Sequence, residues 1–407
     1  MDTQLNKYAE LAVKVGINIQ RGQYLWVSAP IGTEDFVRKV VKEAYLAGAK
    51  KVHVNWYDEE ILRTHYELAP DEVFLEFPSW EVQATEEVVD DGGAFLYIDA
   101  TDPDLLNGIP VERIMNFQKA QGVALEKFRE AIQIDAISWS ILAIPNTKWA
   151  DKVFPSLPEE NRVEALWESI FQAVRIHEEN PISAWKIHIE TLKERADLLT
   201  EKKYKKLHYA GPGTDLTIEL PDKHLWLTGS SMTPQGITFV ANMPTEEVYT
   251  VPLKTGINGY VTSTKPLAYQ GNVIEQFTLT FENGEIVKIE AETGENLLQQ
   301  LIETDDGACF IGEVALVPHQ SPISSSGILF FNTLFDENAS NHLAIGSAYP
   351  TCYEGGSNMT EEERLAVGLN DSIVHEDFMI GSEKMNIDGI YEDESREPIF
   401  RNGNWAF

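Results

Sequence analysis

The sequence predicts an α/β protein, with an N-terminal α/β domain built on a largely parallel sheet and a β-rich α+β C-terminal domain. Two observations predict this division. Over residues 1–150, short apolar runs alternate with longer segments of helical period, a pattern typical of βαβ units and a parallel sheet. After about residue 206, alternation with period two takes over. We therefore expect two domains, residues 1–203 and 204–407.

The first predicted element is a helix over residues 5–15, whose apolar side chains recur on one face. A strand is expected at 24–28. A helix follows at 33–48, with Thr33 at the N-cap position, acidic residues in the first turn and Gly48 at the end. Further strands are expected at residues 52–56, 94–98 and 137–144.

The next segment, residues 155–206, is predicted to be mainly helical. Amphipathic helices are expected at 159–176 and 185–199, where prolines mark the boundaries. The charged run at 201–206 is typical of a solvated helix end. Beyond it, short β-like runs are expected at 225–228, 238–241, 247–251, 259–263 and 276–281.

The charge of the chain excludes several classes of function. It contains 32 Lys and Arg against 65 Asp and Glu, a formal net charge of −33. Nucleic acids and anionic membranes are bound through clustered basic residues, so neither is an expected partner. Hydrophobic residues make up 43% of the chain, which is too rich for a disordered acidic protein. A folded, acidic protein of the kind common among enzymes is expected.

The compartment is predicted from cysteine content and targeting signals. The chain has two cysteines, Cys309 and Cys352, whereas secreted proteins commonly carry a disulfide framework. The N-terminus is charged where a signal peptide needs an apolar run. The most apolar stretch, 134–145, is interrupted by polar residues and is shorter than the roughly 20 residues needed to cross a bilayer. These features predict a cytoplasmic protein.

Common catalytic motifs are missing from the sequence. GxGxxG, the Walker loop, GxSxG and HExxH do not occur, so nucleotide-dependent and serine-hydrolase chemistry have no support. The candidate functional residues are instead a set of carboxylates and histidines in the second half. His375 and Asp377 lie two apart in a β-like run, which places them on one face with Glu376 on the other. Glu313 opens a strongly apolar strand, and only one of the adjacent acids at 246–247 can face the same site.

The argument for a metal site is electrostatic. Several carboxylates in a partly dry site take up protons unless a cation neutralises them. Carboxylates with only two histidines suit Zn²⁺, Co²⁺ or Mn²⁺, with Mg²⁺ as a further option. Such a set can hold two ions about 3.5–4 Å apart with one Glu bridging them. Spacing alone leaves the alternative open that each acid lies separately on the solvated surface.

At these residues the sequence resembles the thermophilic metalloaminopeptidases, the family of aminopeptidases T and S and PepS. The resemblance begins near Tyr8 and continues to the C-terminus, so it covers essentially the whole chain. The matching strings are Pro-Thr-Glu-Glu-Val at 244–248, Gly-Glu-Val-Ala-Leu-Val-Pro at 312–318, Asn-Thr-Leu-Phe-Asp-Glu-Asn-Ala at 332–339, and His-Glu-Asp-Phe-Met-Ile-Gly-Ser at 375–382.

The resemblance implies a homodimer of two-domain chains, with the metal site in the C-terminal domain. Each chain is expected to hold two divalent ions, Zn²⁺ or Co²⁺, with Mg²⁺ or Mn²⁺ as alternatives. Glu313 is expected between the ions, and Tyr349 is expected to be a catalytic tyrosine. The metal ligands that the resemblance implies are Glu247, Glu313, Glu337, His342, His375 and Asp377.

The implied activity is that of a metalloaminopeptidase acting on peptides with a free N-terminus. In the mechanism that the resemblance implies, two metal ions would activate a water that hydrolyses the first peptide bond. Glu313 is the candidate to take the proton of that water, and the Tyr349 hydroxyl would stabilise the oxyanion. Two alternatives stay open, because fold and ligands do not fix the substrate. One is an amidase or another dinuclear metallohydrolase on the same scaffold, and the other is a non-catalytic binding module.

Overall fold

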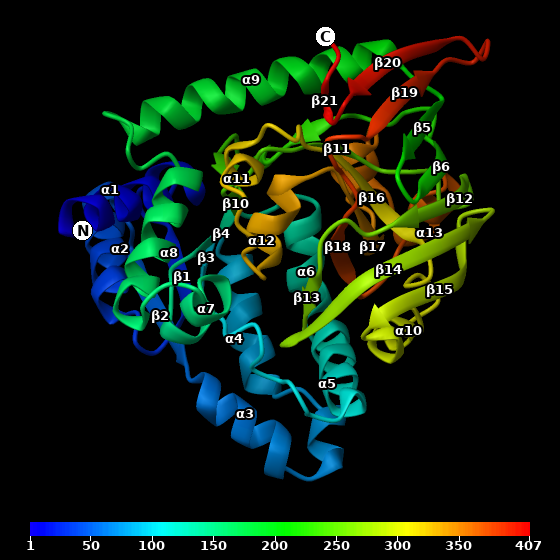
Figure 1. The fold of residues 1–407 in the computed structure, drawn as a ribbon. Coiled ribbons are helices and arrows are strands. Elements are labelled where there is room, and N and C mark those ends of the chain that lie inside the picture. Colours follow the sequence, from blue (N-terminus) through cyan, green and yellow to red (C-terminus); the bar gives the residue numbers. More distant parts are fainter. The chain divides into compact units, whose positions relative to one another are not determined.

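The computed structural model describes residues 1–407, which pack into two compact units. Unit 1 comprises Met1–Glu190 and Gly229–Thr245, and unit 2 comprises Thr191–Thr228 and Glu246–Phe407. Figure 1 shows the elements of both units along the chain. The predicted domains, 1–203 and 204–407, stay a prediction about which segments fold independently. No helix of the protein is both long enough and apolar enough to cross a membrane.

Unit 1 is built on a five-stranded sheet in which every pairing is parallel, as the sequence predicts. Its strand order is β10-β4-β3-β1-β2. The strands are β1 (Tyr24–Pro30), β2 (Lys51–Tyr57), β3 (Ala94–Asp99), β4 (Trp139–Ala143) and β10 (Asn242–Met243). A small antiparallel pair, β8 (Ser230–Met232) and β9 (Thr238–Val240), also belongs to this unit.

Helices connect the parallel strands. The helix expected at 33–48 is α2, with Thr33 at its N-cap and Gly48 in the left-handed conformation at its C-cap. The helix expected at 5–15 is α-helical only to Leu11 and continues as a π-helix over Ala12–Gly16. The helices are α1 (Asp2–Leu11), α2 (Glu34–Ala47), α3 (Glu59–Leu68), α4 (Ser79–Asp90), α5 (Val111–Ala124), α6 (Glu126–Gln133), α7 (Thr147–Val153), α8 (Glu159–Ala173) and α9 (Pro181–Lys202), which runs on into unit 2.

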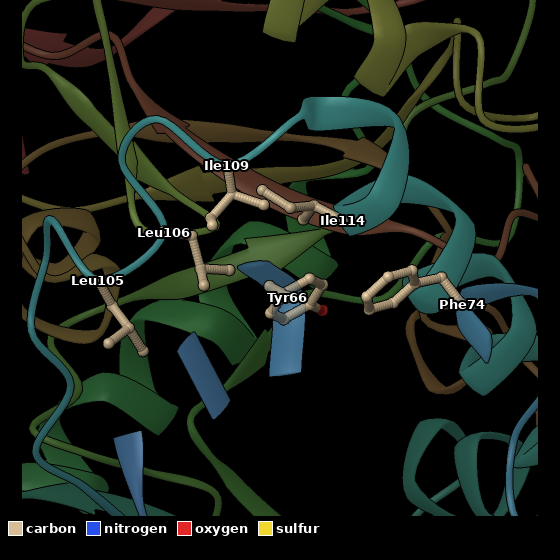
Figure 2. Close-up of a cluster of buried hydrophobic side chains, with 6 residues drawn as sticks. All are labelled: Tyr66, Phe74, Leu105, Leu106, Ile109 and Ile114. Atoms are coloured by element: carbon tan, nitrogen blue, oxygen red, sulfur yellow. The ribbon is translucent and has the colours of Figure 1, made fainter. Parts of the chain in front are cut away.

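A compact apolar cluster holds the segment from α3 to α5 together. Tyr66 of α3 stacks on Phe74, with ring planes 2° apart and centroids at 5.2 Å. Figure 2 shows these rings beside aliphatic side chains from the loop before α5 and from α5 itself. Burial of these side chains stabilises a segment whose helices expose much of their surface. The cluster contains Tyr66, Phe74, Leu105, Leu106, Ile109 and Ile114.

Unit 2 contains a large antiparallel sheet, in agreement with the predicted β-rich second half. Its strand order is β13-β14-β12-β6-β5-β19-β20-β21, and β15 pairs with β14. The strands are β5 (Lys206–Gly211), β6 (Thr214–Glu219), β12 (Ile257–Thr262), β13 (Leu267–Tyr269), β14 (Asn272–Glu282), β15 (Glu285–Thr293), β19 (Asn386–Ile390), β20 (Arg396–Arg401) and β21 (Asn404–Trp405).

A second sheet of unit 2 carries the candidate site. It is antiparallel throughout, with the order β18-β17-β16-β11-β7. Two of its strands, Ile311–Leu316 and His342–Gly346, are buried at every residue, and most of their residues are apolar. The strands are β7 (Leu227–Thr228), β11 (Val248–Thr250), β16 (Ile311–Leu316), β17 (His342–Gly346) and β18 (His375–Met379). The remaining helices are α10 (Glu295–Ile302), α11 (Pro322–Ser325), α12 (Thr333–Asp336) and α13 (Glu361–Ala366).

Candidate metal centre

The register of three strands places acids and imidazoles on one face of the second sheet. Glu313 of β16 pairs with Ala344 of β17, which pairs in turn with Asp377 of β18. Residues directly opposite each other in antiparallel strands share a face. His342 and His375 lie two residues from Ala344 and Asp377 along their strands, so they share that face too. The small Ala344 side chain therefore lies among four potential metal ligands.

A β-bulge lies directly before Glu313, and from Glu313 onward β16 pairs regularly with β17. The pairing shifts between Ile311, which is opposite Ile345, and Glu313, which is opposite Ala344. In a regular ladder Glu313 would share the face of Ile311, the opposite side of the sheet. The bulge centres on Gly312, where an added Cβ would lie 2.1 Å from a backbone oxygen. Only glycine allows this close approach of the two strands.

The converging side chains form two overlapping groups. In the first, His342 Nε2 lies 3.1 Å from Glu247 Oε2 and 3.7 Å from Glu313 Oε1. In the second, His375 Nε2 lies 3.4 Å from Glu313 Oε2 and 3.7 Å from Asp377 Oδ2. Within each group the potential ligand atoms lie within 4.8 Å of one another. Glu313 belongs to both groups and turns one oxygen to each histidine.

Backbone carbonyls orient both imidazoles. His342 Nδ1 lies 3.1 Å from the carbonyl oxygen of Ser340, and His375 Nδ1 lies 2.8 Å from that of Ser347. Since a carbonyl only accepts, each Nδ1 is the donor, which leaves Nε2 facing the carboxylates. A neutral Nε2 would present a lone pair to carboxylate oxygens, so either a proton or a metal ion must lie between them.

The pKa values of the central groups reflect this crowding. Burial acts to raise the pKa of Glu313, but the two imidazoles outweigh it and lower the pKa to about 2. Burial acts to lower the pKa of His375, but Asp377 and Glu313 outweigh it and raise the pKa to about 9. Burial and the Glu313 charge raise the pKa of Asp377 to about 6, although His375 opposes this. Protons on the imidazoles thus supply the positive charge that this site requires.

Two further predicted residues lie beside these groups. Glu337, in the 3-10 helix Glu337–Ala339, is buried and belongs to neither group. Its pKa is raised well above the usual value by burial and by the charges of Asp377 and Glu247. The Tyr349 ring lies 4.8 Å from that of His375, centroid to centroid. Burial and the nearby carboxylates raise the pKa of Tyr349 well above its usual value, which keeps its hydroxyl protonated.

The residues present fit divalent metal ions. Four carboxylates and two imidazoles form a donor set suited to Zn²⁺, Co²⁺ or Mn²⁺. Asp377 Oδ1 is buried without a hydrogen-bond partner, although buried polar atoms are nearly always satisfied. A cation bound at this face would give that oxygen a partner. The candidate ligands that the structure brings to this region are Glu247, Glu313, Glu337, His342, His375 and Asp377.

Some contributors to the site carry no recognisable sequence signal. The Ser340 and Ser347 carbonyls orient imidazoles through the backbone, so their side chains give no indication of this role. Asn338, adjacent to Glu337, is fully buried and donates to the Glu337 carboxylate over 3.1 Å. In the sequence, Asn338 is marked only by its place in the string at 332–339, which is typical of the family.

The comparisons with known proteins agree with the geometry. A profile of the thermophilic metalloprotease family (M29) matches residues 1–405. Aminopeptidase AmpS of Bacillus subtilis (strain 168) is 57% identical over 404 residues, 99% of this chain and 98% of that protein. Aminopeptidase 2 of Geobacillus stearothermophilus is 50% identical over 406 residues, 100% of this chain and 98% of that protein.

A solved structure extends the likeness to the fold. The structure of wild-type AmpT from Thermus thermophilus matches with a TM-score of 0.91 at 42% identity, covering 100% of both chains. The fold class expected from the sequence is therefore confirmed, as is the resemblance noted from its motifs. On the family profile and these full-length relatives, the chain belongs to the thermophilic metalloprotease family M29.

Proposed function

We propose that this metalloprotease is an aminopeptidase that removes the N-terminal residue from peptides and holds two divalent ions per chain. The names of its relatives support the aminopeptidase activity. The observation that carries the two-ion proposal is the position of Glu313, whose oxygens belong to two separate groups of potential ligands. In this proposal Glu247, Glu313 and His342 contribute to one ion, and Glu313, His375 and Asp377 contribute to the other.

Glu337 is proposed as the sixth ligand. It is buried beside both groups, and its carboxylate interacts with the charges of Asp377 and Glu247. Divalent ions, when bound, would polarise the scissile carbonyl and lower the pKa of a water toward about 7. Zn²⁺ or Co²⁺ suits this mixture of carboxylates and imidazoles, with Mg²⁺ or Mn²⁺ as alternatives.

Glu313 is proposed to move the proton in the reaction. Its carboxylate lies between the two groups of potential ligands, where it could contact a water bound there. It would take that proton from the attacking water and deliver it to the leaving amine, which is general base and then general acid catalysis. Glu247, also buried and acidic, is proposed to anchor the positively charged α-amine of the substrate.

Tyr349 is proposed to stabilise the developing oxyanion. Its hydroxyl stays protonated because burial and the surrounding carboxylates raise its pKa. It can therefore donate a hydrogen bond when negative charge forms on the substrate oxygen. The ring also lies against His375, which places it beside the second group of ligands.

Substrate specificity and metal dependence test this function. Aminoacyl-p-nitroanilides should be hydrolysed, and the same compounds with an acetylated α-amine should not. A chelator should abolish the activity, and Zn²⁺ or Co²⁺ should restore it. Cleavage of free and acetylated substrates at equal rates would instead identify an amidase, the alternative hydrolase on this scaffold. Absence of bound divalent ions at neutral pH, without activation by added metal, would identify a non-catalytic binding module.

We also propose that the enzyme acts in the cytoplasm as a homodimer. Cys309 and Cys352 are both free thiols, in keeping with a reducing compartment. The homodimer is the assembly that the family resemblance implies. Sedimentation equilibrium at micromolar concentration should give twice the 45.8 kDa chain mass, and a mass equal to one chain would contradict the dimer.

A further inference from the structure

A buried carboxamide connects two segments that carry proposed ligands. The Asn338 side chain is fully buried. Its Oδ1 accepts a hydrogen bond from the backbone N–H of Glu246 at 2.7 Å. Its Nδ2 donates to Glu337 Oε1 at 3.1 Å and to the Leu334 carbonyl at 3.0 Å. The acceptor and both donor hydrogens of this amide can therefore be satisfied together.

These bonds join parts of the chain that lie far apart in sequence. Glu246 immediately precedes Glu247 in the irregular segment before β11, whereas Glu337 begins the 3-10 helix after α12. The hydrogen bond between Glu246 and Asn338 spans 92 residues. Asn338 thus binds the segment that carries Glu247 through its oxygen and the carboxylate of Glu337 through its nitrogen.

The Glu337 carboxylate needs such a donor. The charges of Asp377, Glu247 and Glu313 disfavour its ionised form, and that of His342 opposes them. The amide of Asn338, which is also bonded to Glu246 and Leu334, donates to this carboxylate and favours one orientation of it. Groups that hydrogen-bond to metal ligands orient them in this way, and their loss typically weakens metal binding.

We infer that Asn338 is a positioning residue of the metal centre, which orients Glu337 and holds the segment of Glu247 for ion binding. This inference rests on the proposed function, because it requires Glu337 to be a metal ligand. It goes beyond that proposal by assigning a role to a neutral side chain that is not itself proposed to touch an ion or the substrate.

A double-mutant cycle on metal affinity tests the inference. Affinity for Zn²⁺ is measured by competition with a chromogenic chelator, for the wild type, Asn338→Ala, Glu337→Gln and the double variant. Asn338→Ala should weaken binding about 10- to 100-fold. In the Glu337→Gln background the same change should have a clearly smaller effect, because the carboxylate that Asn338 orients is gone. Equal losses in both backgrounds, or no loss in either, would overturn the inference.

Asn370→Ala is the matched control. Asn370 is also a buried carboxamide in unit 2, but its Nδ2 donates to the backbone carbonyls of Gly307 and Gly346 rather than to a carboxylate. Both alanine variants should lower the melting temperature of the metal-free protein. Only Asn338→Ala should also lower Zn²⁺ affinity. An equal loss of affinity in Asn370→Ala would show that Asn338 has a structural role only.

A second variant covers the case in which Asn338→Ala does not fold. Asn338→Asp keeps an oxygen for the Glu246 N–H, but its ionised form cannot donate to Glu337. The visible spectrum of the Co²⁺-loaded protein should differ from that of the wild type, and an unchanged spectrum would contradict the inference.

If Glu337→Gln alone binds Zn²⁺ normally, the proposed ligand set itself is wrong. If Glu337→Gln weakens binding and Asn338→Ala does not, only the role of Asn338 is wrong.

Discussion

At the scale of single residues, the proposed role of Tyr349 in stabilising the oxyanion can be tested by substitution. Tyr349→Phe removes the hydroxyl and keeps the ring that packs beside His375. The variant should fold and bind metal normally, whereas kcat should fall about 10²- to 10³-fold, the usual cost of one oxyanion donor. Steady-state kinetics with an aminoacyl-anilide, together with metal analysis, provides the measurement. Turnover close to the wild-type rate with metal bound would remove Tyr349 from the mechanism.

Proton release should accompany metal binding. The pKa of His375 is raised to about 9 in the metal-free protein, so this imidazole is protonated at neutral pH. Because a metal ion binds only the neutral ring, binding must displace the proton, and affinity should rise with pH up to about 9. Calorimetric titration at pH 7.5 in buffers of different ionisation enthalpy should show release of roughly one to two protons per chain. Binding heats that do not depend on the buffer would contradict this.

The same shift has a consequence for the metal-free protein. A histidine whose pKa is higher in the folded than in the unfolded chain stabilises the fold fully below the unfolded value of about 6.5. That contribution is lost as the pH rises through about 9, the folded value for His375. The His375 contribution to the free energy of unfolding should therefore decrease between these two pH values when metal is absent.

Some of the site could be predicted from single residues. The spacing of His375 and Asp377 places them on one face of a strand, and both lie on β18. The choice of Glu247 over Glu246 rested on the family resemblance, because alternation shows only that the two face opposite ways. Asn338 could not be identified, since a lone asparagine in a short 3-10 helix shows no periodicity and its partner Glu246 is distant in sequence.

At the scale of secondary structure, the bulge at Gly312 is the feature most important for the candidate site. Gly312→Ala would place a Cβ 2.1 Å from the Ser347 carbonyl oxygen, so the strands must separate or the bulge must be lost. The position of Glu313, the next residue, would then change. We expect the free energy of unfolding to fall by roughly 2 kcal/mol or more, and metal affinity to fall with it.

Chemical denaturation and chelator competition check this prediction. Gly211→Ala is a suitable control, because its added Cβ would meet the flexible side chain of Met385 at 3.3 Å. It should change neither quantity appreciably. Wild-type metal affinity in Gly312→Ala would show that the bulge does not determine the direction of Glu313.

Several elements could not be predicted for clear physical reasons. α4 has no fully buried residue, so its sequence lacks a strong apolar stripe. β10 contains only two residues, too few to show any alternation. In contrast, α2 has early acids and a left-handed terminal glycine, and its predicted limits differ from the observed ones by a single residue at each end.

At the scale of the whole molecule, the sequence does not show when a later segment of the chain adds a strand to a sheet formed by earlier segments. Residues 229–245 follow the first strands of unit 2, yet they belong to unit 1, where β10 pairs with β4. That pairing places Asn242 opposite Ile141. The two residues are so far apart in the sequence that no local pattern predicts their register. Strand order in a sheet depends on such distant contacts, whereas periodicity reports only local structure.

Metal binding should stabilise the two units unequally. Every proposed ligand lies in unit 2, so saturating Zn²⁺ should slow hydrogen exchange in β16, β17 and β18. Exchange in β1, β2, β3 and β4 of unit 1 should stay as it is in the metal-free protein. Mass spectrometry of peptides after exchange resolves these segments. Equal protection throughout the chain would show that the ions act on the whole molecule instead.

Anomalous diffraction from crystals grown with Zn²⁺, recorded on both sides of its absorption edge, tests the two-ion centre most directly. The proposal predicts two strong peaks in each chain, one among Glu247, Glu313 and His342 and the other among Glu313, His375 and Asp377. The two peaks should lie about 3.5–4 Å apart, on either side of the Glu313 carboxylate. A single peak, or peaks away from these side chains, would contradict the account.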